Sequence, residues 1–110
     1  MEINIILKII WLHFISDFLL QSDWMAVNKS NNSFALGIHG FIYGIPFLII
    51  DPIYSILNML LHFLIDGISS QLTTHFYKNE QRHWFFVTIG ADQAIHFTIL
   101  ILTYKLFVLS

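Results

Sequence analysis

The sequence predicts an all-α protein, a membrane-spanning four-helix bundle, and three observations support this. Hydrophobic residues make up 56% of the 110 residues and charged residues only 11%, whereas soluble domains carry about 25% charged residues. Four apolar segments are each close to the ~17–25 residues that a membrane-crossing helix needs. Histidine and aspartate also recur in pairs, four residues apart, inside three of these segments, and this spacing places each pair on one face of a helix.

The four helices are expected at about residues 3–20, 34–50, 53–71 and 84–109, within a single transmembrane domain that covers residues 1–110. Loop 1 (residues 21–33) is polar, and Ser33 at its end is a suitable N-cap for the second helix. Asp51 and Pro52 supply an N-cap and a favoured first residue for the third helix. So short a turn makes the second and third helices antiparallel neighbours. Loop 3 (residues 73–83) is polar and separates the last two helices.

The two halves of the chain share short motifs. LHFISD at 12–17 is nearly repeated by LHFLID at 61–66, and Ile-His occurs at 38–39 and again at 95–96. Because the first and third helices run in the same direction, these motifs suggest two duplicated helical hairpins in a parallel repeat. The second helix carries Gly40 and Gly44, and the fourth carries Gly90 and Ala94. Small residues at this spacing let two helices approach closely.

Seven ionisable side chains lie inside the apolar segments. An uncompensated aspartate near the middle of a membrane helix costs about 2.5–3.5 kcal/mol on insertion scales. Counted at ~1.5 Å of rise per residue, all seven lie in the half of the bilayer that adjoins loops 1 and 3, because up-and-down helices bring these loops to the same side. We therefore expect them to converge on one site, composed of His13, Asp17, His39, His62, Asp66, Asp92 and His96.

These seven residues are candidate metal ligands. Four imidazoles and three carboxylates suit a divalent transition metal such as Zn, Mn, Fe or Ni. Seven groups exceed a tetrahedral zinc site, so we expect a dinuclear centre that shares a carboxylate, or one metal with some aspartates orienting histidine rings. His39 is a ligand or the general base, and Asp17 is assigned a catalytic role as well. A network that only fixes helix packing and a proton relay are the alternatives.

Three polar residues near the cluster are assigned to substrate binding. Gln21 lies one helical turn beyond Asp17, on the same face. Lys29 lies in loop 1 above the site, where an ammonium group can bind an anionic head group. Gln93 neighbours Asp92 but points about 100° away around the helix.

The motifs HxxxDFxxQ at 13–21, HG at 39–40, HxxxD at 62–66 and DQxxH at 92–96 together resemble a domain-of-unknown-function family. Its members are small integral membrane proteins of bacteria and their phages, and the resemblance spans about residues 10–100. It implies an architecture and a residue set but no reaction. The family often has a basic residue shortly after the third-helix aspartate, whereas Gly67-Ile68-Ser69-Ser70 follows here. The pattern is also similar in style to membrane-bound metal-dependent hydrolases of bacteria.

These observations favour a membrane protein with a buried His/Asp metal site, and the expected chemistry is metal-dependent hydrolysis of a membrane-located phosphate or ester. The alternatives are a metal-ion or proton transporter or channel, and a phage or bacterial membrane interaction protein whose polar network is structural. A transporter needs polar residues along both halves of its pathway. The clustering of polar residues in one half instead favours a blind pocket that opens toward loops 1 and 3.

The lipid bilayer is the expected partner, and the small size of the chain also suggests a homodimer. The net charge is −2 without a basic run, so nucleic acid is not expected as a partner. We expect the protein in the bacterial inner membrane with loops 1 and 3 cytoplasmic, because Lys29, Lys78 and Arg82 lie in these loops whereas Lys8 and Lys105 lie near the termini.

Overall fold

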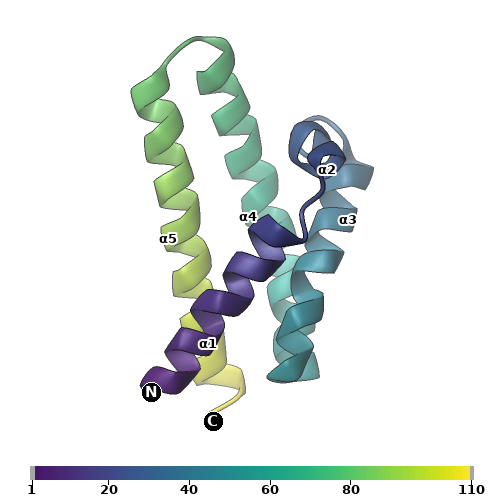
Figure 1. Cartoon of the computed structure of the whole chain (residues 1–110), viewed down its shortest axis with the longest axis vertical. Helices are drawn as coiled ribbons and strands as arrows, with labels where there is room; N and C mark the ends of the chain where they lie inside the picture. Colours follow the sequence, from purple (N-terminus) through teal and green to yellow (C-terminus); the bar gives the residue numbers. More distant parts are fainter. Residues whose placement is uncertain (1, 110) are drawn as a thin grey trace.

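The two C-terminal apolar segments form the longest helices, α4 (Pro52–Lys78) and α5 (Arg82–Phe107), in a computed structural model that describes residues 2–109. They run antiparallel, and a short turn joins them at the end of the molecule opposite both termini (Figure 1). Glu80 in this turn has a φ of 57°, which lets the chain reverse within three residues. Loop 3 was predicted at 73–83, but most of it is helical, because α4 continues seven residues beyond the predicted end.

The first predicted helix is divided into α1 (Ile3–Phe14) and one π-helical turn (Ile15–Leu19). The wider turn closes with a hydrogen bond from the Leu20 amide to the Ile15 carbonyl at 2.9 Å. Single π-helical turns inside helices are frequent at functional sites, and this one contains Asp17.

Loop 1 was predicted as a polar loop, but it contains a short helix, α2 (Asp23–Asn28). Ser22 caps this helix by accepting a hydrogen bond from the Met25 amide. The next helix, α3 (Ser33–Gly44), continues as a 3-10 segment, Ile45–Ile49, that contains Pro46. Its N-cap is Asn32 rather than the predicted Ser33, because the Asn32 side chain accepts hydrogen bonds from the backbone amides of Phe34 and Ala35.

The predicted start of α4 is confirmed. The Asp51 carboxylate accepts a hydrogen bond from the Tyr54 amide at 2.9 Å, and Pro52 is the first helical residue. The packing of α3 on α4 also follows the predicted small residues. A Cβ atom on Gly44 would lie 3.2 Å from the Ser55 carbonyl oxygen. Gly90 differs from the expectation, because a Cβ atom there would meet nothing within 4 Å.

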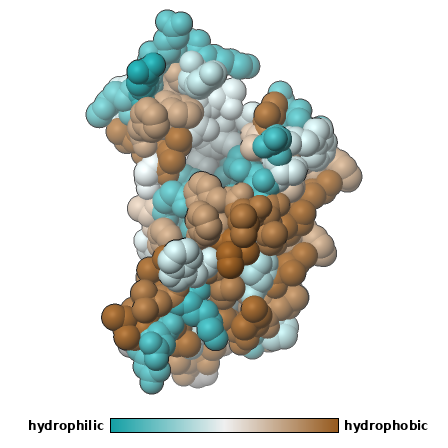
Figure 2. Space-filling model, in the orientation of Figure 1, coloured by the Kyte–Doolittle hydropathy of each residue, from teal (hydrophilic) through white to brown (hydrophobic). Residues whose placement is uncertain are grey.

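An apolar core fills the half of the molecule that holds the termini. Ile9, Phe47 and Leu100 are fully buried there, together with Tyr43 and Tyr54. Much of the remaining apolar surface is exposed, and Figure 2 shows it as a broad hydrophobic area with hydrophilic groups toward both ends of the molecule.

Two helices, α4 and α5, are long and apolar enough to cross a membrane. In α5, only 11% of the most apolar window is buried inside the structure, so most of this window lies at or near the surface. The all-α prediction is confirmed, but the described chain has five α-helices instead of four. The parallel repeat of two hairpins stays a prediction.

Candidate metal centre

The three His/Asp pairs predicted from the i,i+4 spacing are close pairs in the structure. The Nε2 atom of His13 lies 3.7 Å from Asp17 Oδ2. The Nε2 atom of His62 lies 3.8 Å from Asp66 Oδ2. In the reversed pair on α5, Nε2 of His96 lies 3.1 Å from Asp92 Oδ1. All six side chains lie in the interior, and their helices bring the pairs together in one part of the bundle.

Four ligand atoms from three segments converge in what we call the central cluster: Nε2 of His39 and His62, Asp17 Oδ1 and Asp66 Oδ2. His39 lies 2.9 Å from His62, 3.0 Å from Asp17 and 3.4 Å from Asp66. His62 lies 3.6 Å from Asp17 and 3.8 Å from Asp66. Neighbouring ligands of a tetrahedral zinc ion, at 2.0–2.2 Å from the metal, are separated by about 3.4 Å. The five separations of 2.9–3.8 Å scatter around this value, but Asp17 and Asp66 do not belong to one group of atoms that all lie within 4.8 Å of one another.

The possible ligands extend beyond the central cluster to α5. Among residues 2–109, three groups of side chains have ligand atoms within 4.8 Å of one another. Each pair of groups shares one residue, either Asp17, His62 or His96. The geometry therefore allows one ion in the central cluster and a second ion beside His96. The three groups are Asp17-His39-His62, His62-Asp66-His96 and Asp17-Asp92-His96.

Six of the seven predicted ligands enter these groups, and His13 does not. Both nitrogens of His13 are engaged elsewhere: Nδ1 lies 2.9 Å from the Tyr43 hydroxyl, and Nε2 lies 2.7 Å from Gln93 Oε1. Because the amide oxygen of Gln93 accepts, His13 donates from Nε2 and its Nδ1 accepts from the tyrosine. His13 is thus placed beside the cluster as a hydrogen-bonding neighbour.

Gln93 connects the aspartates. Its amide nitrogen lies 3.4 Å from Asp17 Oδ2 and 3.2 Å from Asp92 Oδ2, while its oxygen faces His13. The sequence analysis assigned Gln93 to substrate binding as a neighbour of Asp92 that points about 100° away around the helix. In the structure its flexible side chain reaches the buried groups, and this arrangement orients the carboxylates and the His13 ring.

Tyr43 is a residue of the site that the sequence analysis missed. Its ring stacks on His62 with 3.7 Å between ring centroids and an interplanar angle of 10°, and its hydroxyl contacts His13. The signal was present in the sequence, because Tyr43 follows His39 by four residues and therefore lies on the same helical face. Aromatic residues in apolar segments are common, so the spacing alone did not distinguish it.

The electrostatics of the site favour a cation. The three aspartates are at most 9% exposed, and Lys29 is the one lysine or arginine that pairs with them among residues 2–109. With the imidazoles neutral, the carboxylates and the ammonium leave a net charge of −2. Buried charge of one sign is costly, and one divalent cation balances it.

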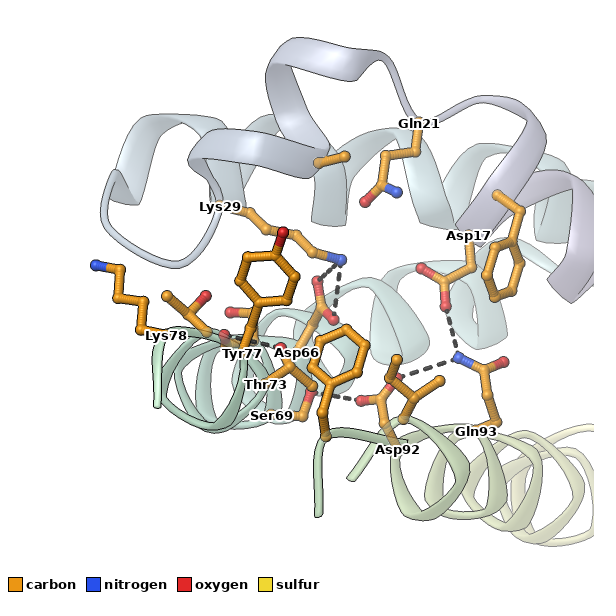
Figure 3. Close-up of a pocket in the computed structure, with 16 residues that line it drawn as sticks. Asp17, Gln21, Lys29, Asp66, Ser69, Thr73, Tyr77, Lys78, Asp92 and Gln93 are labelled. Atoms are coloured by element: carbon orange, nitrogen blue, oxygen red, sulfur yellow. Dashed lines mark hydrogen bonds and ion pairs between the residues drawn. The ribbon is translucent and has the colours of Figure 1, made fainter. Parts of the chain in front are cut away.

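A pocket with a volume of about 440 Å³ adjoins the cluster. Asp17, Asp66 and Asp92 contribute to its lining, and so do Gln21 and Lys29 (Figure 3). The other lining residues come mainly from the halves of α4 and α5 near their turn, with Ala26 from α2 and Phe18 from the π-helical turn. Asp17 and Asp66 of the central cluster therefore face a pocket on the side of loops 1 and 3, whereas His39 and His62 do not line it.

A line of buried polar side chains along α4 runs from the site into the opposite, mainly apolar half of the bundle. Polar residues follow one another at intervals of four along α4, and all are buried: Tyr54, Asn58, His62, Asp66 and Ser70. The Asn58 amide donates to the Tyr54 carbonyl and to Thr103 Oγ1, both at 3.0 Å. The Tyr54 hydroxyl donates to the Leu100 carbonyl at 2.7 Å. These polar groups are thus satisfied locally, among the apolar side chains of the core.

The family resemblance inferred from the motifs is confirmed by comparison with known proteins. No curated protein and no solved structure matches the sequence significantly. The match to the family described as "Protein of unknown function (DUF3307)" covers residues 5–110. Because this range is nearly the whole chain and includes all the residues of the candidate centre, the protein belongs to the DUF3307 family.

Proposed function

We propose that this protein is an integral membrane protein that binds a divalent transition metal and uses it to hydrolyse a membrane-located phosphate or ester. The observation that carries the proposal is the central cluster itself. Asp17, His39 and His62 have ligand atoms within 4.8 Å of one another, Asp66 lies close to both histidines, and these groups adjoin an open pocket in a negatively charged site. A purely structural network does not need a pocket of this size beside it.

The types of ligand atom in the site indicate which metals it can bind. Imidazole nitrogens with carboxylate oxygens suit Zn, Mn, Fe or Ni. In the proposal, Asp17, His39 and His62 would hold the first ion, and Asp66 lies close enough to both histidines to join them. His96 and Asp92 hold a second ion, with Asp17 as the shared carboxylate, when the centre is dinuclear. Paired metals about 3.5–4 Å apart are common in enzymes that act on phosphate esters.

The chemistry proposed for the centre is activation of water. A bound metal lowers the pKa of a coordinated water to about 7 and polarises the scissile group. Asp17 lines the pocket as well as the cluster, so in a centre with one metal its second carboxylate oxygen is the candidate base for the attacking water. His39 has its Nε2 within 3.4 Å of three other ligand atoms, which favours a ligand role over the general-base role.

The membrane part of the proposal is supported by α4 and α5, since both have the length and composition to cross a bilayer. In this proposal, lipid covers most of the exposed apolar side chains, and a second copy of the chain in a homodimer covers the others. The pocket faces the same side as loops 1 and 3, which we place in the cytoplasm of a bacterial inner membrane from the distribution of lysine and arginine.

Metal-dependent hydrolysis can be tested with purified protein in lipid nanodiscs. We expect the protein loaded with Zn or Mn to hydrolyse a chromogenic phosphate ester or carboxylate ester, and a chelator to remove this activity. The Asp17→Asn variant should lose at least 99% of the activity, because it removes a shared ligand and the candidate base. Metal-loaded protein without activity on either ester class would contradict the hydrolase assignment but not the metal site.

A transporter is the second candidate, and the buried polar residues along α4 favour it. These residues extend from the pocket into the opposite half of the bundle. Against it, Asn58 and Tyr54 bond to backbone carbonyls, and Phe47 and Leu100 fill the same region. The chain has no cysteine, so single cysteines report access directly. We expect Gln21→Cys to react with a water-soluble maleimide and Asn58→Cys to remain unlabelled. Equal labelling at both positions would favour transport.

A further inference from the structure

We propose that Lys29 is a phosphate-binding residue and that the group entering the pocket is a phosphate monoester carried on an apolar chain. This inference rests on the proposed metal-dependent hydrolysis and chooses phosphate over carboxylate ester as the substrate class. It is carried by the position of Lys29, the charge of the pocket, and an unpartnered hydroxyl in the pocket wall.

Lys29 follows α2 in the chain, and its side chain extends to Asp66 on α4. Its ammonium nitrogen lies 3.1 Å from Asp66 Oδ2 and 3.4 Å from Asp66 Oδ1, and its side chain is 18% exposed (Figure 3). Asp66 Oδ2 is also an atom of the central cluster. The ammonium therefore stands where it can neutralise Asp66, and a metal ion at Asp66 would compete with it for the same oxygen.

The charge of the pocket selects an anion when metal is present. The lining contains three aspartates and two lysines, Lys29 and Lys78. One divalent ion changes the sum of these charges from −1 to +1. With Asp66 bound to the metal, Lys29 retains its charge beside the pocket and is available to an incoming oxygen anion. A neutral carboxylate ester would leave this ammonium without a partner.

The pocket wall supplies a further donor. Ser70 is 5% exposed and lines the pocket, yet its hydroxyl has no hydrogen-bond partner in the part of the chain that the structure describes. A buried polar atom without a partner is unusual, and a phosphate oxygen would satisfy it. Phe18, Phe85 and Ile89 line other parts of the pocket, so an apolar chain can lie beside the phosphate group.

Native mass spectrometry of the zinc-loaded protein in detergent tests this inference. The probes are dioleoyl phosphatidic acid, dioleoylglycerol, which lacks the phosphate, and inorganic phosphate as a competitor. We expect phosphatidic acid to bind at least tenfold more tightly than dioleoylglycerol. Lys29→Gln should weaken phosphatidic acid about tenfold, as expected for loss of a charge-assisted hydrogen bond. Lys29→Arg should retain most of the binding, and Lys105→Gln, which removes an exposed lysine outside the pocket, should change it less than threefold.

The zinc content of each variant separates the possible outcomes. Lys29→Gln should keep its zinc, because removing the ammonium removes a competitor for Asp66. Equal binding by wild type and Lys29→Gln, equal binding of both lipids, or zinc loss in Lys29→Gln would each overturn the inference. Displacement of the lipid by an equal concentration of inorganic phosphate would support phosphate recognition and identify free phosphate as its source. If wild-type protein holds no zinc, the proposed function itself fails.

Discussion

Replacing His62 by alanine should lower the affinity for metal by more than 100-fold. His62 belongs to two of the three groups of possible ligands and lies 2.9 Å from His39. Loss of a residue that only supports a ligand commonly costs 10–100-fold in metal affinity, so loss of a shared ligand should cost more. Metal content after dialysis against a metal buffer measures the effect.

A matched control for His62→Ala is His83→Ala, because His83 is exposed and outside the cluster. We expect His83→Ala to retain its metal. The His62→Gln variant keeps most of the side-chain volume over Tyr43, so it separates metal loss from a packing defect. If His62→Gln and His62→Ala bind metal as tightly as wild type, His62 is not a ligand and the central cluster is only a packing network.

Replacing Ile95 by arginine should reduce stable membrane insertion several-fold. Ile95 lies near the middle of α5 and is 44% exposed, so in a bilayer it faces lipid. Arginine at the centre of a membrane helix costs about 2.5–3.5 kcal/mol on insertion scales. The same substitution on a water-facing surface would have little effect. The measurement is the amount of protein that stays in the membrane fraction after alkaline carbonate extraction.

Trp84→Arg provides the control for this experiment. Trp84 is 54% exposed and lies two residues from the start of α5, where a long basic side chain can extend to the membrane surface. We expect it to remain in the membrane fraction like the wild type. Similar retention of the two arginine variants, or extraction of the wild type by carbonate, would show that α5 does not cross a membrane.

The i,i+4 pairs and the up-and-down helices were sufficient to predict that the histidines and aspartates meet. Helical spacing places His62 with Asp66 on one face, and two antiparallel helices bring Asp92 and His96 beside them. The cap at Asp51 was predictable because its local sequence determines it. These features depend on contacts within one helix or between helices joined by a short turn.

Other features depend on long-range packing and could not be predicted from the sequence. The π-helical turn around Asp17 has no composition signal. His13 has the same spacing from its aspartate as His62, yet contacts with Tyr43 and Gln93 engage both of its nitrogens. Lys29 was assigned to substrate binding from its place in loop 1, but its contact with Asp66 depends on the fold of α2 over the pocket.

Elemental analysis of the wild-type protein, purified in detergent without chelator, tests the central claim most directly. The buried charge and the three groups of possible ligands predict at least one Zn, Mn, Fe or Ni ion per chain. Two ions per chain would identify the dinuclear centre. Less than about 0.1 ion per chain, without uptake when these metals are added, would contradict the account.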